Sequence, residues 1–471
     1  MAGTSIEQLL EGWVHLDGPN LAARLALALR QLVESGLLPP GEQLPSERLL
    51  AHALHVSRPT VSAALDQLRE AGVVVSRQGS GTKVATHPER SRTEAQPAPF
   101  TSAVLGANVV NLAAAVPFDA SHLPGLSLSP TDLLSAVPDH GVVPFGLDAF
   151  REAAAVRLSQ VGLRSRLDQI IVTAGGHHAL RVAFETLAAP TAPVLVEEYT
   201  YGAVFDLAAR NGTALIGIER DADGVDPQRL DVALRRTRPA FVLLATSIHS
   251  PSGQTTSPGR LRDLAAVLNA HLVPVVVDET YAELHYETRP TPLASMLHGP
   301  SITVESVSKT GWAGLRTGWI RFSEELRPRL LGAFDRDLGL PVPSQLMALR
   351  VLAAYATLLP ARRNDLARKA RLLREQLAEQ VPYWNVVMPH GGLTHWIDTG
   401  TADATTIVDN ARRAGLLITS GDAFHHRRAT SSHVRICHDR PEALIIAATA
   451  KLGGLCGFRA AKPEQRRLFS P

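Results

Sequence analysis

The central part of the sequence contains one lysine, although it is rich in arginine. Between residues 84 and 368 the only lysine is Lys309, which comes just after the predicted strand 301–306. Ser306 and Ser308 precede it, and Arg316 comes seven residues later. An amine at the end of a strand is suited to form a Schiff base with pyridoxal phosphate, while Arg316 and Ser306 hold the phosphate. Ser308 is a further candidate for cofactor binding. The alternative is an ordinary solvated lysine.

Two further features suit the same cofactor. Gly175, Gly176 and His177 follow a predicted strand and open a predicted helix, where free backbone N–H groups and the helix dipole favour a phosphate. By itself, a Gly-Gly pair at this position is only a turn. Asp278 ends the apolar run 273–277. A carboxylate there is costly unless it has a partner, and the protonated pyridine nitrogen of the cofactor is such a partner.

The elements that must position these groups alternate between strands and helices. Short apolar runs predict strands at 170–173, 193–197, 240–246, 271–278 and 301–306. Helical spacing follows several of these runs, which predicts a parallel α/β sheet with its binding residues beyond the carboxyl ends of the strands. From about Leu326 the chain is predicted to be mostly helical. It then ends in a smaller α+β subdomain formed by 391–398, 415–420 and 433–439.

The stretch 306–319, SVSKTGWAGLRTGW, resembles the lysine motif of fold-type I aminotransferases. The resemblance implies that Tyr281 bonds the phenolic oxygen of the cofactor and that Tyr201 stacks on its pyridine ring. It also implies that Arg435 grips the α-carboxylate of an amino-acid effector as a bidentate fork. Alternatively, Tyr201 is an ordinary core or rim tyrosine, and Arg435 belongs to a structural ion pair.

The sequence departs from that family at two places. Ser250-Pro251-Ser252-Gly253 stands where the family has Asn-Pro-x-Gly, and Gly141 stands where the family has a tyrosine that reaches the phosphate of the neighbouring subunit. We expect cofactor binding to survive these losses and transamination to be slow. The eighteen histidines have no HExxH or comparable spacing, so no metal site is expected.

The first 85 residues predict a different unit. Leucines at helical spacing predict a helix from Leu21 to about Gly36, and Ser46 and Ser57 stand at the N-cap positions of two short helices. The second of these helices has an apolar face made of Val61, Ala64, Leu65 and Leu68. Two β-like runs around a glycine turn follow. One helix, a helix-turn-helix and a hairpin make a winged helix-turn-helix.

The first 85 residues resemble the DNA-binding domain of GntR-type bacterial regulators almost end to end, and the matching motif is residues 36–84. In that family the second helix of the motif lies in the major groove, and residues near the helix starts and the wing tip contact phosphates and bases. Carried over, the DNA-binding candidates are Ser46, Arg48, Ser57, Arg58, Thr60, Gln78 and Gly79. Alternatively, the serines only cap helices and the arginines are solvated. Charge does not decide, because residues 1–85 contain seven basic and eight acidic side chains.

Composition places the whole chain among ordinary globular proteins. Of its 471 residues 45% are hydrophobic and 20% are charged, and the formal net charge of +2 gives no global indication of a nucleic-acid partner. Two cysteines, Cys437 and Cys456, exclude a disulfide scaffold and indicate a reducing compartment. No signal peptide or membrane span is apparent, so we expect a cytoplasmic protein with no membrane partner.

These observations predict a multidomain chain: a small α+β winged helix-turn-helix domain at 1–86, a linker at 87–107, an α/β fold-type I aminotransferase-like domain at 108–455 and a basic tail at 456–471. This order is similar to that of the MocR subfamily of GntR-type transcriptional regulators.

The resemblance implies a pyridoxal-phosphate-dependent regulator that is a head-to-tail homodimer and binds double-stranded operator DNA. Through a Schiff base at Lys309 it would sense an amino acid, another amine or the B6 vitamer itself. Two alternatives stay open. One is an active aminotransferase with an attached DNA-binding domain, and the other is a cofactor-free regulator that keeps the old fold for dimerisation.

Overall fold

The computed structural model describes residues 9–10, 12–16, 20–34, 38, 42–70, 73–77, 81–84, 109–137, 139–334, 339–427 and 429–456. It divides into two compact units, Met1–Ala98 and Pro99–Pro471, which are considered separately below. The expected linker at 87–107, the wing-tip residues Gln78 and Gly79, and the expected tail from residue 457 onward lie outside the described residues.

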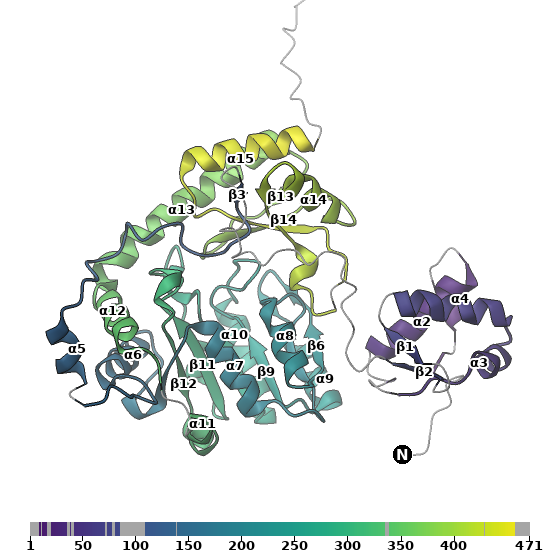
Figure 1. Cartoon of the computed structure of the whole chain (residues 1–471), viewed down its shortest axis with the longest axis horizontal. Helices are drawn as coiled ribbons and strands as arrows, with labels where there is room; N and C mark the ends of the chain where they lie inside the picture. Colours follow the sequence, from purple (N-terminus) through teal and green to yellow (C-terminus); the bar gives the residue numbers. More distant parts are fainter. Residues whose placement is uncertain are drawn as a thin grey trace, which may run out of the picture. The chain divides into compact units, whose positions relative to one another are not determined.

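The N-terminal unit is a winged helix-turn-helix (Figure 1). Its elements are η1 (Trp13–His15), α2 (Leu21–Glu34), α3 (Glu47–Ala53), α4 (Arg58–Glu70) and the antiparallel strands β1 (Val74–Arg77) and β2 (Gly81–Val84). The predicted apolar face of α4 is buried, with Val61, Ala64 and Leu65 fully enclosed by the core of this unit. Leu21, in contrast, is 44% exposed at the first position of α2.

The second unit is built on a seven-stranded sheet with the strand order β4-β12-β11-β10-β9-β5-β6 (Figure 1). These strands are β4 (Ile170–Thr173), β5 (Val194–Glu197), β6 (Leu215–Ile218), β9 (Phe241–Leu244), β10 (Val275–Asp278), β11 (Ser301–Ser306) and β12 (Gly318–Phe322). β12 runs antiparallel to both β11 and β4. The sheet is therefore mixed, which corrects the expectation of a parallel sheet.

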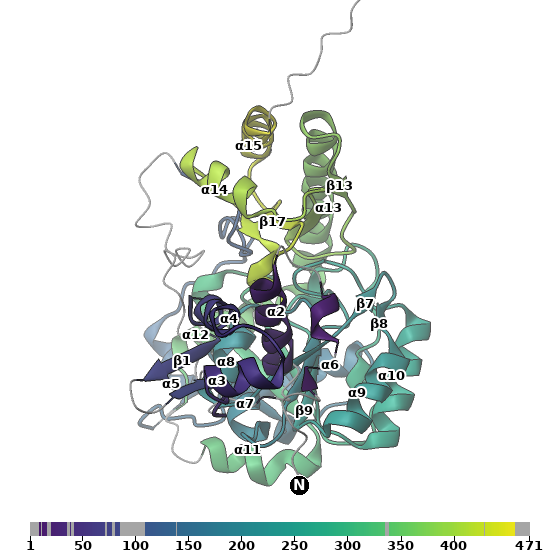
Figure 2. The same cartoon turned by 90° about the vertical axis from the view of Figure 1, so that its right-hand side faces the viewer.

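Helices cover both faces of this sheet, because successive side chains of each strand point to opposite faces. One face packs on α6 (Asp148–Gln160), α9 (Pro227–Thr237), α10 (Pro258–His271) and α12 (Val342–Ala353). The other packs on α7 (Gly176–Leu187), α8 (Ala203–Arg210) and α11 (Arg327–Phe334). Figure 2 shows α9 and α10 side by side. We call residues 139–353 the large subdomain.

The C-terminal subdomain, residues 381–456, contains a four-stranded sheet of order β13-β14-β17-β16. Its strands are β13 (Asn385–Val386), β14 (Thr394–Asp398), β16 (Thr419–Ser420) and β17 (His433–Cys437), and its helices are α14 (Thr405–Arg413) and α15 (Glu442–Leu455). The long helix α13 (Tyr355–Gln380) packs along α15 and joins the two subdomains (Figure 1). A parallel pair, β3 (Val110–Asn111) and β15 (Leu416–Leu417), attaches the start of this unit to its end. The shorter elements are β7 (Arg220–Asp221), β8 (Gly224–Val225), α5 (Pro130–Ala136) and the 3-10 turns η3 (Leu167–Gln169), η4 (Ala282–Leu284), η5 (Leu293–Met296), η6 (Ala313–Leu315), η7 (Glu324–Leu326) and η8 (Gly421–Phe424).

Three predicted strands are shorter than expected: 193–197 becomes β5, 240–246 becomes β9 and 271–278 becomes β10. The run 271–278 becomes strand only from Val275, because His271 still belongs to α10 and Leu272 ends that helix with a positive φ of 50°. Two sheet strands, β6 and β12, were not predicted. Among the described residues, no single helix is long and apolar enough to cross a membrane, and only the pair α12 and α13, bent by 77°, meets that test jointly.

Candidate functional site

Lys309 lies in the loop that leaves the carboxyl end of β11. The turn is held by Ser306, whose hydroxyl donates to Thr317 O at 3.1 Å and accepts the Ser308 N–H at 3.1 Å. Nζ of Lys309 donates to the carbonyl oxygen of Ala115 at 2.7 Å. Both hydrogen bonds of the Ser306 hydroxyl are made within this turn, so Ser306 shapes the loop that carries Lys309.

Burial makes the protonated amine of Lys309 unusually acidic. It lowers the pKa of Lys309 from 10.5 to about 8, and the nearby cation of Arg435 acts in the same direction. The phenol of Tyr201 and the carboxyl of Asp278 act in the opposite direction but do not compensate. A neutral amine is the nucleophilic form, so this surrounding favours attack on an aldehyde.

Asp278 ends β10, next to the strand that leads to Lys309. Its carboxylate accepts the backbone N–H of Thr280 at 2.9 Å and also the Thr280 hydroxyl. Burial raises the pKa of Asp278, and the charge of Lys309 opposes this shift. A buried carboxylate held in this way is a suitable partner for a protonated ring nitrogen.

Two tyrosines lie beside the lysine. Lys309 Nζ is 5.0 Å from the ring centroid of Tyr281, whose hydroxyl donates to Ala115 O at 3.3 Å. The ring of Tyr201 meets that of His177 edge-on, with 6.4 Å between the centroids. Burial raises the pKa of both phenols, so both are hydrogen-bond donors at neutral pH.

A second cluster forms where β4 ends and α7 begins. Gly175 precedes α7 with a positive φ of 81°, and no side chain caps this helix. A methyl group on Gly175 would lie 3.5 Å from both the guanidinium of Arg316 and Oγ of Ser308. Ser308 Oγ is buried and has no hydrogen-bond partner among the described residues. An uncapped helix start, a cation and a free hydroxyl are together suited to hold a phosphate, and we call this cluster the cradle.

The strand pairing explains how this cradle is assembled. β12 is antiparallel to β4 with Gly318 opposite Thr173, which brings the exposed Arg316 next to Gly175. Arg316 donates to Ala174 O at 2.6 Å. Only glycine fits at position 318, because a Cβ there would lie 2.9 Å from Gly175 Cα.

Arg435 reaches the site from β17 of the C-terminal subdomain. Its guanidinium donates to Ala113 O at 2.7 Å and lies 4.5 Å from the ring centroid of Phe424. Its Nε is buried without a partner among the described residues. Arg435 therefore has donor capacity left for a carboxylate.

The donor set fits pyridoxal phosphate. Lys309, Asp278, Tyr281 and Tyr201 come together, and the cradle at Gly175 provides the unpaired hydroxyl of Ser308 for a phosphate oxygen. When bound, this cofactor supplies an aldehyde that condenses with amines and a ring that accepts electrons.

Sequence reasoning missed several participants. The carbonyl groups of Ala113 and Ala115 have no side-chain signature. Phe424 was not a candidate on sequence, whereas Thr280, two residues after Asp278, could have been recognised as a local hydrogen-bond donor.

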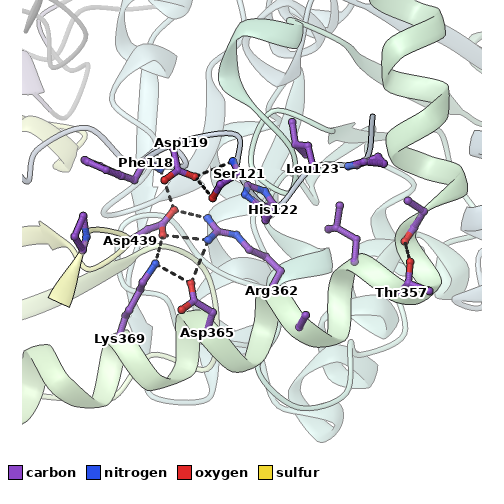
Figure 3. Close-up of a pocket in the computed structure, with 15 residues that line it drawn as sticks. Phe118, Asp119, Ser121, His122, Leu123, Thr357, Arg362, Asp365, Lys369 and Asp439 are labelled. Atoms are coloured by element: carbon purple, nitrogen blue, oxygen red, sulfur yellow. Dashed lines mark hydrogen bonds and ion pairs between the residues drawn. The ribbon is translucent and has the colours of Figure 1, made fainter. Parts of the chain in front are cut away.

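A pocket of about 690 Å³ lies near this site (Figure 3). It contains the buried Asp439, which accepts hydrogen bonds from Arg362 and Lys369. His122 also lines the pocket, and its Nε2 lies 3.0 Å from the carbonyl oxygen of Thr310, the residue after Lys309.

In the N-terminal unit, the predicted DNA-binding residues gather at two helix starts. Ser46 accepts the Leu49 N–H at 3.4 Å, and Ser57 accepts the Thr60 N–H at 3.3 Å, so both serines cap helices. The side chain of Arg58 is 70% exposed and pairs with Glu47 at 3.4 Å. Arg48 is also exposed.

The mixed sheet, the lysine after β11 and the small C-terminal subdomain define the fold-type I aminotransferase fold. The chain belongs to the family of aminotransferases of class I and II, a pyridoxal-phosphate-dependent family whose model matches residues 108–451. Residues 21–84 match bacterial regulatory proteins of the gntR family. The chain therefore has the domain organisation of the MocR subfamily, in which a regulatory DNA-binding domain is joined to an aminotransferase domain.

Similar proteins include HTH-type transcriptional regulators. The HTH-type transcriptional regulator YdcR of Escherichia coli K12 is 28% identical, over 76% of this chain and 79% of its own length. The HTH-type pyridoxine biosynthesis transcriptional regulator PdxR of Corynebacterium glutamicum is also 28% identical, over 71% of this chain and 73% of its own.

The fold of the second unit is that of solved aminotransferases. The α-aminoadipate aminotransferase LysN of Thermus thermophilus, complexed with N-(5'-phosphopyridoxyl)-L-leucine, matches 76% of this chain and 94% of its own with a TM-score of 0.66 and 21% identity.

Proposed function

We propose that this chain is a transcriptional regulator that binds operator DNA through its N-terminal unit and senses a small amine-bearing molecule, or the B6 vitamer itself, at Lys309. The observation that carries the proposal is the buried amine of Lys309, which donates to Ala115 O at 2.7 Å and feels the charges of Asp278 and Arg435, in a chain that also carries a gntR-type domain.

In this proposal each side chain has a defined task. Lys309 forms the Schiff base, Asp278 holds the ring nitrogen and Tyr281 donates to the phenolic oxygen. Tyr201 covers the ring, and the phosphate lies among Gly175, Gly176, His177, Ser308 and Arg316. Ser306 contributes by shaping the turn that carries Lys309, as its two backbone hydrogen bonds indicate.

Arg435 selects ligands that carry a carboxylate, which makes an amino acid the preferred class of effector. The relative named for pyridoxine biosynthesis supports the B6 vitamer as the other candidate. To shift the protein from a mostly closed to a mostly open arrangement, the effector must bind the open arrangement more tightly than the closed one by about 5 kcal/mol.

The DNA contacts are assigned to Ser46, Arg48, Ser57, Arg58 and Thr60, with Gln78 and Gly79 at the wing tip. Ser46 and Ser57 can serve both as caps and as phosphate contacts, because a hydroxyl that accepts a backbone N–H can still donate. We further propose a head-to-tail homodimer, a cytoplasmic location and domain limits at 86 and 108.

The test has two parts. Borohydride reduction of the pyridoxal-phosphate-loaded protein, followed by peptide mass spectrometry, is expected to place the cofactor on Lys309, and Lys309→Ala is expected to abolish the visible absorbance without unfolding the protein. Fluorescence anisotropy with DNA from upstream of its own gene then reports whether cofactor and amino acids change the affinity. Reduced cofactor on another lysine contradicts the proposal.

A second candidate function is aminotransfer, because the structure assembles Lys309, Asp278, Tyr281 and Arg435 in one place. Steady-state formation of a keto acid from an amino donor separates an enzyme from a sensor. Turnover of about 10 per second, the usual enzyme rate, favours the enzyme.

A further inference from the structure

Residues 110–118 form an extended segment, here called the strap, that runs through the Lys309 site. It begins as β3, which pairs with β15 of the C-terminal subdomain. The next residue, Leu112, donates to Leu417 O at 2.9 Å and accepts the Cys437 N–H at 2.8 Å. The first part of the strap is thereby built into the C-terminal subdomain.

Two buried charged residues continue this attachment. Arg440 donates to Asn111 O at 2.8 Å and to Ala114 O at 2.9 Å. Asp439 accepts the Phe118 N–H at 3.2 Å, where the strap enters the pocket wall drawn in Figure 3. Both residues belong to the C-terminal subdomain, so the strap is fixed to it on either side of Ala115.

The contacts at Ala115 have a different origin. Its carbonyl oxygen accepts hydrogen bonds from Lys309 and Tyr281, and both of these residues belong to the large subdomain. Two residues earlier, Ala113 O accepts a hydrogen bond from Arg435. The strap carbonyls are therefore bound to the same donors that the proposed function assigns to cofactor and effector.

We propose that the strap is an internal ligand of this site, and that a ligand at Lys309 displaces Ala115 O and so releases the strap from the large subdomain. The inference rests on the proposed Schiff base at Lys309. When the amine condenses with the aldehyde, the nitrogen forms a C=N bond, loses its two hydrogens and the aldehyde oxygen leaves as water. If this imine nitrogen is protonated it has a single N–H, which the phenolic oxygen of the cofactor would accept, and Tyr281 would turn to the same oxygen.

A carboxylate on Arg435 removes a second contact of the strap, because it competes with Ala113 O for the guanidinium. Arg435 lies on β17, so this contact is one to the C-terminal subdomain. Cofactor and effector thus remove separate contacts of one segment. In sequence the strap directly follows the residues that join the two units. Its release is therefore the step by which occupancy at Lys309 reaches the connection to the DNA-binding unit.

Amide hydrogen exchange on the full chain tests the inference, with pyridoxal phosphate alone as the probe. In the cofactor-free protein the amides of residues 113–116 and 118 are expected to be protected. Loss of a hydrogen bond to a charged donor corresponds to about a tenfold increase in local opening, so loaded protein is expected to exchange about tenfold faster there. Unchanged exchange in protein shown by mass spectrometry to carry the cofactor on Lys309 overturns the inference.

Lys309→Met in cofactor-free protein provides an independent arm, because it removes the donor to Ala115 O without any ligand. It is expected to reproduce the faster exchange of the loaded wild type. Lys451→Met, at an exposed position of α15, is the matched control and is expected to leave the strap protected. If no cofactor attaches to Lys309, the proposed function fails, whereas protection of the strap in Lys309→Met overturns the internal-ligand inference itself.

Discussion

The guanidinium of Arg435 lies over the ring of Phe424, with 4.5 Å between Cζ and the ring centroid. Burial lowers the pKa of Arg435, and the phenols of Tyr281 and Tyr201 oppose that shift. The face of the Phe424 ring supports the planar guanidinium of Arg435. An N–H group at the edge of the guanidinium stays directed to the strap carbonyl of Ala113. This arrangement orients the fork before a carboxylate arrives.

Arg435→Lys is therefore expected to weaken carboxylate ligands by about 10- to 100-fold, because the bidentate fork is lost while the charge remains. Isothermal titration of cofactor-loaded protein with amino acids measures the effect, and the absorbance of the lysine-bound cofactor should not change. Arg236→Lys, at an exposed position of α9, is the control. Equal affinities for amino acids and for the corresponding amines in wild type would remove Arg435 from this role.

The pKa of Lys309 predicts the pH dependence of cofactor capture. Because only the neutral amine attacks the aldehyde, the rate should fall about tenfold per pH unit below about 8, rather than below the ordinary 10.5. Stopped-flow absorbance from pH 6 to about 10 measures this profile.

The same pKa also affects stability. The folded value lies below the unfolded one, so folding favours the neutral lysine, and this contribution is lost as the pH falls from about 10.5 to about 8. In cofactor-free protein, Lys309→Met is expected to remove that part of the pH dependence in denaturant titrations. If instead the rate of cofactor capture reaches half its maximum only near pH 10, the result contradicts the buried position of the amine.

Arg58→Ala is expected to weaken specific operator binding by about 1 to 3 kcal/mol if Arg58 reads a base, and to leave the cofactor absorbance unchanged. Arg58→Lys keeps the charge and serves as control. Anisotropy on operator and random DNA separates the two roles, since an equal loss on both assigns Arg58 to a phosphate. Glu47→Gln is expected to tighten binding to both DNAs, because the ion pair with Arg58 at 3.4 Å is removed.

Ser250 and Gly141 predict slow transamination. Each missing hydrogen bond to a charged group is worth about 1.5 to 3 kcal/mol, so turnover should be about a hundredfold or more below the usual 10 per second. Ser250→Asn is expected to restore about tenfold, measured as keto-acid formation, whereas Ser250→Leu adds bulk without the amide and should not. Wild-type turnover at about 10 per second would contradict this expectation.

Much of the site could be predicted from sequence, because it depends on neighbours along the chain. The runs that end at Asp278 and Ser306 identify buried strands, so Asp278 lies at the sheet edge and Lys309 lies in the loop just beyond it. Ser46 and Ser57 accept N–H groups only three residues away, which local spacing predicts well.

Strand neighbours are a different matter. The cradle at Gly175 needs Arg316, and the two meet because β12 inserts antiparallel between β4 and β11. No local pattern carries that information, since pairing direction depends on which distant strands bury each other's faces.

The strap marks the limit most clearly. The sequence alone singled out Lys309, Tyr281 and Arg435 by side-chain chemistry, but Ala113 and Ala115 bind them through backbone carbonyls. Every residue has such a carbonyl, so no residue type distinguishes these two. Only the tertiary structure, which lays the strap between the two subdomains, decided which carbonyl oxygens those buried donors would find.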